Sequence, residues 1–303
     1  MGLPITNLRV LLSEAARRPF QGKILTLGRQ TVHFDAHTLR QLAKEYGVHL
    51  KTPVKVIPPL AQKYAKRGCM SDENLFEALG FSEFVALDNS NYEGAHVLFD
   101  LNNPAPPKEL IGVFDVILDS GTLEHLFHVP NALSNMFHML RPNGRIIQIL
   151  PSSNHMDHGF YMFSPTFLYE YYQQNNFEIN TSQLYRSTPL PRMGCKIYNY
   201  KPGSLYHIQQ GGLDDGVYGI INIVTKKANS TCTKVPQQKD YQTAWRGDKL
   251  GDAVSPNDLW IINLFRLPLK KLAKRVKGLH KVYVRSFRKK GLGLKVEKEF
   301  KEY

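Results

Sequence analysis

Two histidines, His155 and His158, lie three residues apart in a short segment after an apolar stretch. A histidine side chain titrates near neutral pH, so it can take a proton from a hydroxyl or an amine as a general base. We therefore predict that one of the two has a catalytic role. The structural alternative, a hydrogen bond that precedes a helix starting at Pro165, stays open at this point.

The cluster of His155, Asp157 and His158 would also permit a metal site. One short cluster without another ligand group is weak evidence, so we expect no metal ion. Glu124 and His125 are expected to be structural, at the start of a helix where a glutamate complements the helix dipole. The three cysteines have no C-x-x-C spacing, which argues against a disulfide framework and favours a reducing, cytoplasmic location.

Three aspartates, Asp88, Asp100 and Asp119, each follow directly after an apolar segment. In an open parallel sheet, ligands bind beyond the carboxyl ends of the strands, close to the point where the strand order reverses. We therefore predict that these acids lie at a ligand-binding edge. The same edge would include their neighbours Asn89, Leu101 and Ser120, together with Gly28 at the end of the first apolar segment.

Short apolar strands that alternate with helices must carry these residues. Such alternation implies crossover connections and a mostly parallel sheet with helices on both faces. The turn at 141–144 is expected to end a helix at Pro142, with Gly144 at positive φ. The spacing predicts strands over 22–28, 84–87, 96–99, 114–118, 145–150, 177–185 and 218–224, and helices over 5–18, 36–46, 72–79, 122–140 and 165–174.

The segment 114–151, FDVILDSGTLEHLFHVPNALSNMFHMLRPNGRIIQILP, resembles the second half of a class I S-adenosylmethionine-dependent methyltransferase of the type 11-like kind. The resemblance rests on a strand that begins with Phe-Asp, a Glu-His helix, a Leu-x-Pro-x-Gly turn and a strand that ends in Pro. It covers roughly residues 20–228 and is strong only over 84–180. It implies a Rossmann-like α/β fold with a seven-stranded sheet, and S-adenosylmethionine as the cofactor.

The resemblance also implies roles for the strand-end residues. Asp88 would accept hydrogen bonds from the ribose hydroxyls, and Asp100 would contact the adenine. Either aspartate could instead cap the turn that follows it, because Asx residues favour such positions. The complete set of candidate cofactor-binding residues is Gly28, Gln30, Asp88, Asn89, Asp100, Leu101, Asp119 and Ser120.

The first loop departs from the family pattern. Thr26 stands where an acid is usual, Gly28 is the single glycine, and Gln30 and Val32 stand where further glycines would be. Side chains at those two positions would hinder close approach of the cofactor to the backbone. Two interpretations remain, an altered but working pocket or a degenerate one. An unusual insertion at about 33–75 follows this loop.

The net charge of +13 is concentrated at the C-terminal end, where residues 266–303 hold fourteen Lys or Arg and three Glu. A basic segment with an apolar face suits an anionic membrane surface, and less well a nucleic acid, or it packs on the body with a solvated face. We expect a methyltransferase domain over 1–228, and a linker and basic amphipathic extension over 229–303, of which 259–303 is the candidate membrane contact.

The resulting hypothesis is a methyltransferase that acts on a small molecule or a glycan- or lipid-linked precursor, at oxygen. It would be cytoplasmic, with possible peripheral attachment to a membrane. The alternative is a non-catalytic binding or scaffold protein that keeps the fold, again with possible membrane association. The acceptor, the oligomeric state and the role of the insertion are not predicted.

Overall fold

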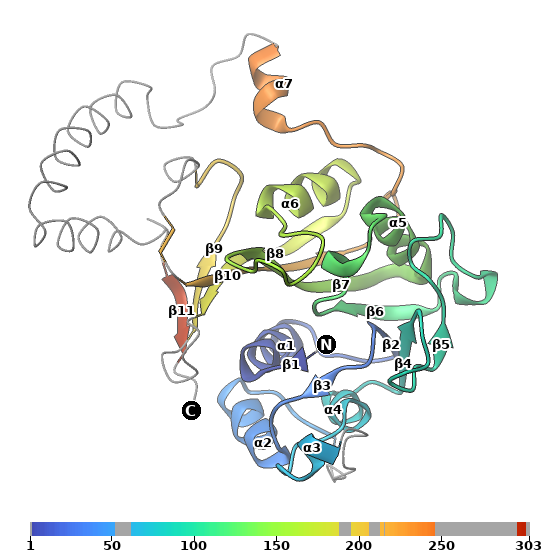
Figure 1. Ribbon diagram of the computed structural model, residues 1–303, viewed down its shortest axis with the longest axis vertical. Helices are drawn as coiled ribbons and strands as arrows, with labels where there is room; N and C mark the ends of the chain where they lie inside the picture. Colours follow the sequence, from blue (N-terminus) through green and yellow to red (C-terminus); the bar gives the residue numbers. More distant parts are fainter. Residues whose placement is uncertain are drawn as a thin grey trace, which may run out of the picture.

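The computed structural model describes residues 2–51, 62–187, 195–205, 213–214, 216–245 and 296–300. Its centre is a single twisted sheet (Figure 1). Five neighbouring strands, β5, β4, β2, β6 and β7, are parallel, and β10 then runs antiparallel between β7 and β8. In spatial order the sheet comprises β11 (Val296–Phe300), β9 (Cys195–Asn199), β8 (Glu178–Ser187), β10 (Val217–Thr225), β7 (Leu140–Ser153), β6 (Phe114–Asp119), β2 (Lys23–Leu27), β4 (Glu83–Asp88) and β5 (Val97–Leu98).

Helices cover both faces of the sheet (Figure 1). Alternate residues of the strands enter two separate cores, as the period-2 geometry of a strand requires. Ile117, for example, packs in the core with α5 and α6, whereas Val116 packs in the other core with α1, α2 and α4. The helices are α1 (Ile5–Arg17), α2 (Ala36–Glu45), α3 (Gln62–Ala65), α4 (Asp72–Leu79), α5 (Val129–Met139), α6 (Pro165–Gln174) and α7 (Lys239–Trp245), with 3₁₀ turns η1 (Lys108–Leu110) and η2 (Leu123–His125).

The predicted fold class is confirmed. The chain has a Rossmann-like α/β fold in which the strand order reverses between β2 and β6. Within the described residues the sheet has nine strands rather than seven, because β9 and β11 extend it beyond β8. The charged sequence of β11 concealed it within the expected basic extension, and charged residues are common in edge strands.

Two local predictions were wrong. The helix expected over 122–140 is divided into η2 and α5, and Pro130 lies in the first turn of α5, where a missing N–H costs nothing. The residue with positive φ in the 141–144 turn is Asn143 at 61°, and Gly144 is not in that region. This turn forms an irregularity within β7, between the pairs Phe114–Leu140 and Val116–Arg145.

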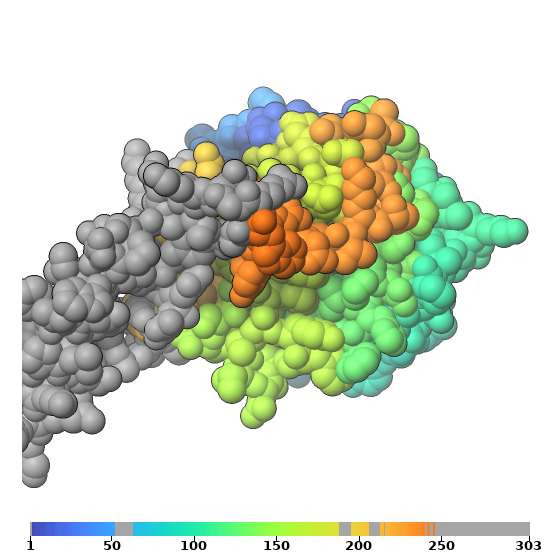
Figure 2. Space-filling model, turned by 90° about the horizontal axis from the view of Figure 1, so that it is seen from above, coloured from blue at the N-terminus to red at the C-terminus, as the bar shows by residue number. Residues whose placement is uncertain are grey.

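The segment after β10 lies along α6 and is tied to it, although the sequence suggested a linker there (Figure 2). The side chain of Asn175 accepts a hydrogen bond from the backbone N–H of Lys234 and donates one to its carbonyl oxygen. The expected amphipathic segment of 259–295 lies outside the described residues. Within the described part of the chain, no helix has the length and apolar character needed to cross a membrane.

Candidate functional site

A cavity of about 350 Å³ lies at the carboxyl ends of β6 and β7, beside the point where the strand order reverses. Parallel sheets place their ligand sites at such a point. The N-terminal residues of the chain form one wall, and the loop after β7 forms the opposite wall. The residues that line the cavity are Gly2, Pro4, Asn7, Ser120, Gly121, Glu124, His125, Ile149, Leu150, Pro151, His155, His158 and Tyr185.

In the first loop, after β2, side chains form hydrogen bonds to the loop's own backbone. Gly28 has a φ of 75°, and its N–H donates to the carbonyl oxygen of Leu87 on β4. The side-chain amide of the buried Gln30 donates to the carbonyl oxygens of Leu27 and Gly28. The side chain of Gln30 is therefore held against the backbone of this loop by its own hydrogen bonds.

Arg29, between Gly28 and Gln30, is held by residues of the insertion. The guanidinium of Arg29 forms a 2.7 Å ion pair with Asp72, at the start of α4, and a 3.0 Å pair with Glu73. Both Arg29 and Asp72 are buried. A further element that the sequence did not predict, a small parallel sheet of β1 (Gly2–Leu3) and β3 (Thr31–Val32), brings the N-terminus over the loop.

Asp88 ends β4 next to this loop and is partly exposed. Its Oδ1 accepts a 3.1 Å hydrogen bond from the N–H of Ser90, an Asx-type contact. Its other carboxylate oxygen has no partner among the described residues. Asn89 beside it is exposed.

Asp100, two residues after β5, is more strongly engaged. Its Oδ1 accepts hydrogen bonds from both the backbone and side-chain nitrogens of Asn102, and Asn102 in turn accepts from the N–H of His128. Leu101 is buried in the core with α5. The structure thus places Asp100 at the predicted edge, where it also organises the loop.

Asp119 lies beneath the cavity rather than on its wall. It is fully buried, and its carboxylate accepts from the N–H groups of Thr122 and Leu123 at the start of η2. Burial raises the pKa of Asp119 to about 6, although these hydrogen bonds lower it. Ser120 does line the cavity, and its Oγ accepts a 2.9 Å hydrogen bond from the side chain of Asn7.

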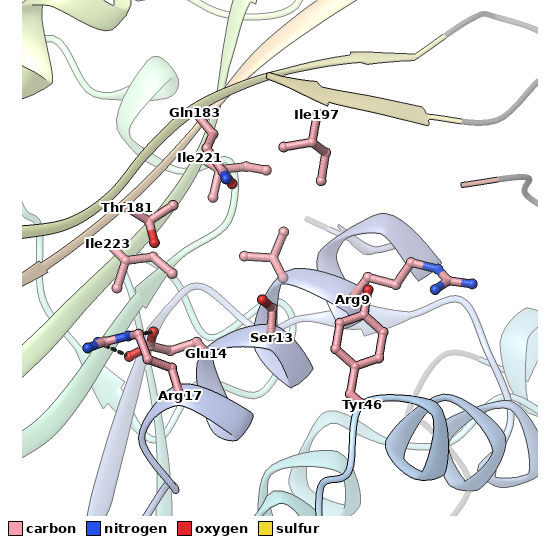
Figure 3. A pocket seen from close by; sticks show the side chains of 11 residues that line it. Arg9, Ser13, Glu14, Arg17, Tyr46, Thr181, Gln183, Ile197, Ile221 and Ile223 are labelled. Carbon is pink, nitrogen blue, oxygen red and sulfur yellow. Dashed lines mark hydrogen bonds and ion pairs between the residues drawn. The ribbon is translucent and has the colours of Figure 1, made fainter. Parts of the chain in front are cut away.

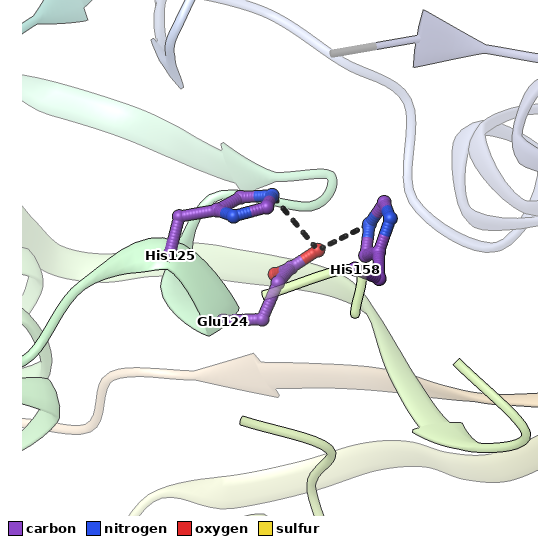
Figure 4. Close-up of side chains that lie close together, drawn as sticks. All are labelled: Glu124, His125 and His158. Carbon is purple, nitrogen blue, oxygen red and sulfur yellow. Dashed lines mark ion pairs between the residues drawn. The ribbon is translucent and has the colours of Figure 1, made fainter. Parts of the chain in front are cut away.

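The two predicted histidines meet in the cavity, next to two residues that the sequence placed in a structural role. Oε1 of Glu124 lies 3.5 Å from Nε2 of His158 and 4.0 Å from Nε2 of His125 (Figure 4). The rings of His155 and His158 are 5.6 Å apart, and the Nε2 of His155 is buried without a partner among the described residues. Asp157 does not join this cluster.

The electrostatics of this group follow from burial. Burial, and then the nearby Asp119, raise the pKa of Glu124 to about 8. Burial, and then the proximity of His158, lower the pKa values of His125 and His155. Neutral imidazoles therefore predominate at these two positions at neutral pH, and a neutral imidazole can accept a proton or bind a metal ion.

The loop after β7 is fixed to η2 through the backbone of Glu124. The carbonyl oxygen of Glu124 accepts from the N–H groups of Phe160 (2.8 Å) and Tyr161 (3.2 Å). These contacts bring His158 to Glu124 although the two are distant in the sequence. Sequence spacing could not show this, since it depends on how two separate loops pack.

A second, smaller cavity of about 120 Å³ lies between α1 and the strands β8 to β10, on one face of the sheet (Figure 3). Arg17 and Glu14 on its wall form two hydrogen bonds of 2.7 Å, and Glu14 also pairs with Arg145 at 2.6 Å. Arg9 on the same wall pairs with Glu45. Arg17–Glu14 is a pair within α1, whereas Glu14–Arg145 and Arg9–Glu45 connect α1 to its surroundings.

No family model matches the chain, and no curated protein matches it. Solved structures do resemble its fold. The 1,6-didemethyltoxoflavin-N1-methyltransferase of Burkholderia thailandensis, with bound S-adenosylhomocysteine, is 15% identical, with a TM-score of 0.35, over 73% of this chain and 76% of that one. A SAM-dependent methyltransferase from Archaeoglobus fulgidus is 12% identical, with a TM-score of 0.35, over 72% and 94%.

A putative methyltransferase from Bacillus halodurans is 10% identical, with a TM-score of 0.36, over 74% of this chain and 100% of that one. Likeness at this level does not carry an activity or a ligand from those proteins to this chain. The Rossmann-like fold itself stands on the strand order and on the parallel pairing of β5, β4, β2, β6 and β7.

Proposed function

We propose that this protein is an S-adenosylmethionine-dependent methyltransferase that methylates an oxygen atom of a small molecule or of a glycan- or lipid-linked precursor. The observation that carries the proposal is Asp88, which ends β4 beside the reversal of strand order with one carboxylate oxygen unpartnered among the described residues. A carboxylate in this position is suited to accept hydrogen bonds from a ribose.

The residues at the strand ends fit such a cofactor in part. Asp88 and Asp100 follow neighbouring strands, so a nucleoside could lie across both. The cavity beside Ser120 would take the methionine end. S-adenosylmethionine, when bound, supplies an electrophilic methyl carbon that an acceptor oxygen attacks as the bond from carbon to sulfur breaks.

The chain's own contribution to the reaction is to orient the acceptor and to remove its proton. Methyl transfer depends on alignment, so a walled cavity contributes by holding the two reactants together. His155 presents a buried, unpartnered Nε2 on the cavity wall, and its lowered pKa keeps the ring neutral at neutral pH. His155 is therefore our candidate for the proton acceptor, with His158 beside it.

Exposed apolar side chains near the cluster support an acceptor that carries an apolar part. Four large side chains are exposed on the two loops that carry Glu124 and His158, and exposed side chains of this size usually mark an interaction surface when they cluster. Phe127 and Phe160 are in edge-to-face contact, with centroids 6.2 Å apart. The four are Phe127, Met156, Phe160 and Met162.

Isothermal titration calorimetry with S-adenosylmethionine and S-adenosylhomocysteine tests the proposal. We expect micromolar binding, and a dissociation constant raised about 10- to 100-fold by Asp88→Ala, the range for lost hydrogen bonds to a charged group. Glu93→Gln, at an exposed acid outside the site, should bind like the wild type. Absence of binding to the folded wild type, or equal binding by Asp88→Ala, would overturn the proposal.

The second candidate function is a non-catalytic binding protein with the same fold. It is favoured by Gln30, which fills the first loop with its own hydrogen bonds. Substitution Gln30→Gly separates the two candidates. If Gln30 only blocks the pocket, the variant gains binding that the wild type lacks. If the pocket works as it is, wild type binds and the variant gains little.

A further inference from the structure

A cluster of three potential metal ligands lies at the cavity, and the function proposed above does not use it as a metal site. The candidate donor atoms are Oε1 of Glu124 and the Nε2 atoms of His125 and His158, which all lie within 4.8 Å of one another. In Figure 4 both imidazole rings point at the same carboxylate oxygen. Two histidines and one glutamate form a ligand set that catalytic zinc sites use, with a further position left for water or substrate.

The distances are close to those that a bound ion requires. Zinc binds nitrogen and carboxylate oxygen at about 2.0–2.2 Å, so two ligands of a tetrahedral ion lie roughly 3.4 Å apart. Oε1 of Glu124 is 3.5 Å from one histidine nitrogen and 4.0 Å from the other. The two histidine rings are about half exposed, which leaves them room to adjust toward an ion.

The burial of Glu124 is a second observation that points to a cation-binding role. Its side chain is 1% exposed, and its Oε2 has no hydrogen-bond partner among the described residues. No lysine or arginine in the described part of the chain pairs with it. A charged carboxylate is costly to bury without a partner, so Glu124 is held as the neutral acid unless a cation binds it.

Backbone contacts also fix the positions of the two loops that carry these ligands. The carbonyl oxygen of Glu124 accepts from the N–H groups of Phe160 and Tyr161, two and three residues after His158. Gly159 packs so closely on Glu124 that an added Cβ would lie 2.8 Å from that carbonyl oxygen. A site whose ligands are positioned by fixed backbone contacts loses little freedom when it binds an ion.

We propose that Glu124, His125 and His158 bind one divalent transition-metal ion at the wall of the cavity. Imidazole ligands select zinc, iron and related ions, whereas magnesium and calcium prefer sites made only of oxygen. The two histidines and the glutamate leave coordination positions open toward the cavity. In the setting of the proposed methyltransferase, on which this last step rests, an acceptor oxygen could bind there and lose its proton more readily.

The test uses the full chain, stripped with a chelator and titrated with Co²⁺, whose visible absorption reports its ligands, and with Zn²⁺ followed by calorimetry. We expect one ion per chain. His125→Ala and His158→Ala should each weaken binding at least 10-fold, and both rings are half exposed, so the fold should persist. His128→Ala is the matched control, since His128 is an exposed histidine three residues from His125 and outside the cluster.

Metal binding at another location must be distinguished from binding at the cluster in the same experiment. Cys232 and His138 approach to 3.7 Å and could take up an ion by themselves. Binding that survives the double variant His125→Ala/His158→Ala but is lost in Cys232→Ser would overturn the proposal, as would the absence of stoichiometric binding. The readout does not depend on S-adenosylmethionine. Metal binding without cofactor binding would refute only the proposed function. Cofactor binding without metal binding would refute only the metal site.

Discussion

Gly159 lies directly against Glu124, and a Cβ on this glycine would be 2.8 Å from the carbonyl oxygen of Glu124 and 3.1 Å from the Nδ1 of His125. The loop after β7 and the η2 turn therefore touch through a residue without a side chain. The contact matters because His158, on one side, and Glu124, on the other, belong to the same cluster.

Substitution Gly159→Ala should push the loop away from η2. We expect a loss of about 1–3 kcal/mol in the free energy of unfolding, the usual cost of overpacking. The weakened Phe160–Glu124 contact should also reduce Co²⁺ affinity at least 10-fold. Met156→Ala, at an exposed side chain of the same loop, should change neither quantity. Equal behaviour of the two variants in denaturant titration and Co²⁺ titration would contradict this account.

The ion pair between Arg29 and Asp72 should be worth much more than the pair between Arg29 and Glu73. The side chains of Arg29 and Asp72 are 10% and 4% exposed, whereas that of Glu73 is 47% exposed. Removing one partner of a buried pair costs about 3–5 kcal/mol, and an exposed pair contributes about 0–1 kcal/mol. Urea titrations of Asp72→Ala and Glu73→Ala should show this difference, and similar losses would count against it.

Asp119 should make stability depend on pH. Burial raises its pKa in the folded protein from 3.8 to about 6, so the unfolded chain releases this proton at a lower pH than the folded protein does. The free energy of unfolding should therefore fall as the pH rises from about 4 to 6, by about 1.4 kcal/mol for each unit of the pKa difference.

In the Asp119→Asn variant, this contribution to the pH dependence of the unfolding free energy should be absent. The measurement is the difference in unfolding free energy between wild type and variant, at several pH values from 4 to 7 and with a chelator present throughout. A difference that does not vary with pH would show that Asp119 ionises in the folded protein as it does in the unfolded chain.

The basic residues of the C-terminal segment should attract the protein to anionic vesicles. Replacing Lys270, Lys271, Lys274 and Arg275 with glutamine should sharply reduce co-sedimentation with phosphatidylserine vesicles, since each basic residue contributes about 1 kcal/mol near such a surface. Truncation at 258 is a poorer test, because it also removes β11 from the sheet. Unchanged sedimentation of the substituted protein would remove the membrane interpretation.

The sequence predicted the central fold well because its strands are short apolar runs with clear ends. The helix at Pro165–Gln174 was predicted to the residue, since Pro165 can begin a helix and Asn175 follows its end. β11 was missed because its sequence is mostly charged, and β9, a strand of five residues, lies in a stretch for which the sequence predicted no element. The division between η2 and α5 was also missed, although Pro130 marks the start of the second element.

The candidate site was predicted less completely. His155, His158 and Ser120 line one cavity, and Asp88 ends its strand, while their roles in binding and catalysis stay predictions. Asp119 follows an apolar strand as a ligand-binding acid would, yet it is buried and caps η2. The pairing of Glu124 with His158 depends on contact between two loops, which no local pattern encodes.

The pairing of β11 with β9 covers an edge of the sheet with a strand from near the C-terminal end of the sequence. Without β11, the backbone N–H and C=O groups of β9 along this edge would be unpaired, and an unpaired edge is a template for pairing with another chain. β11 therefore protects β9, so loss of this strand should promote self-association of the protein.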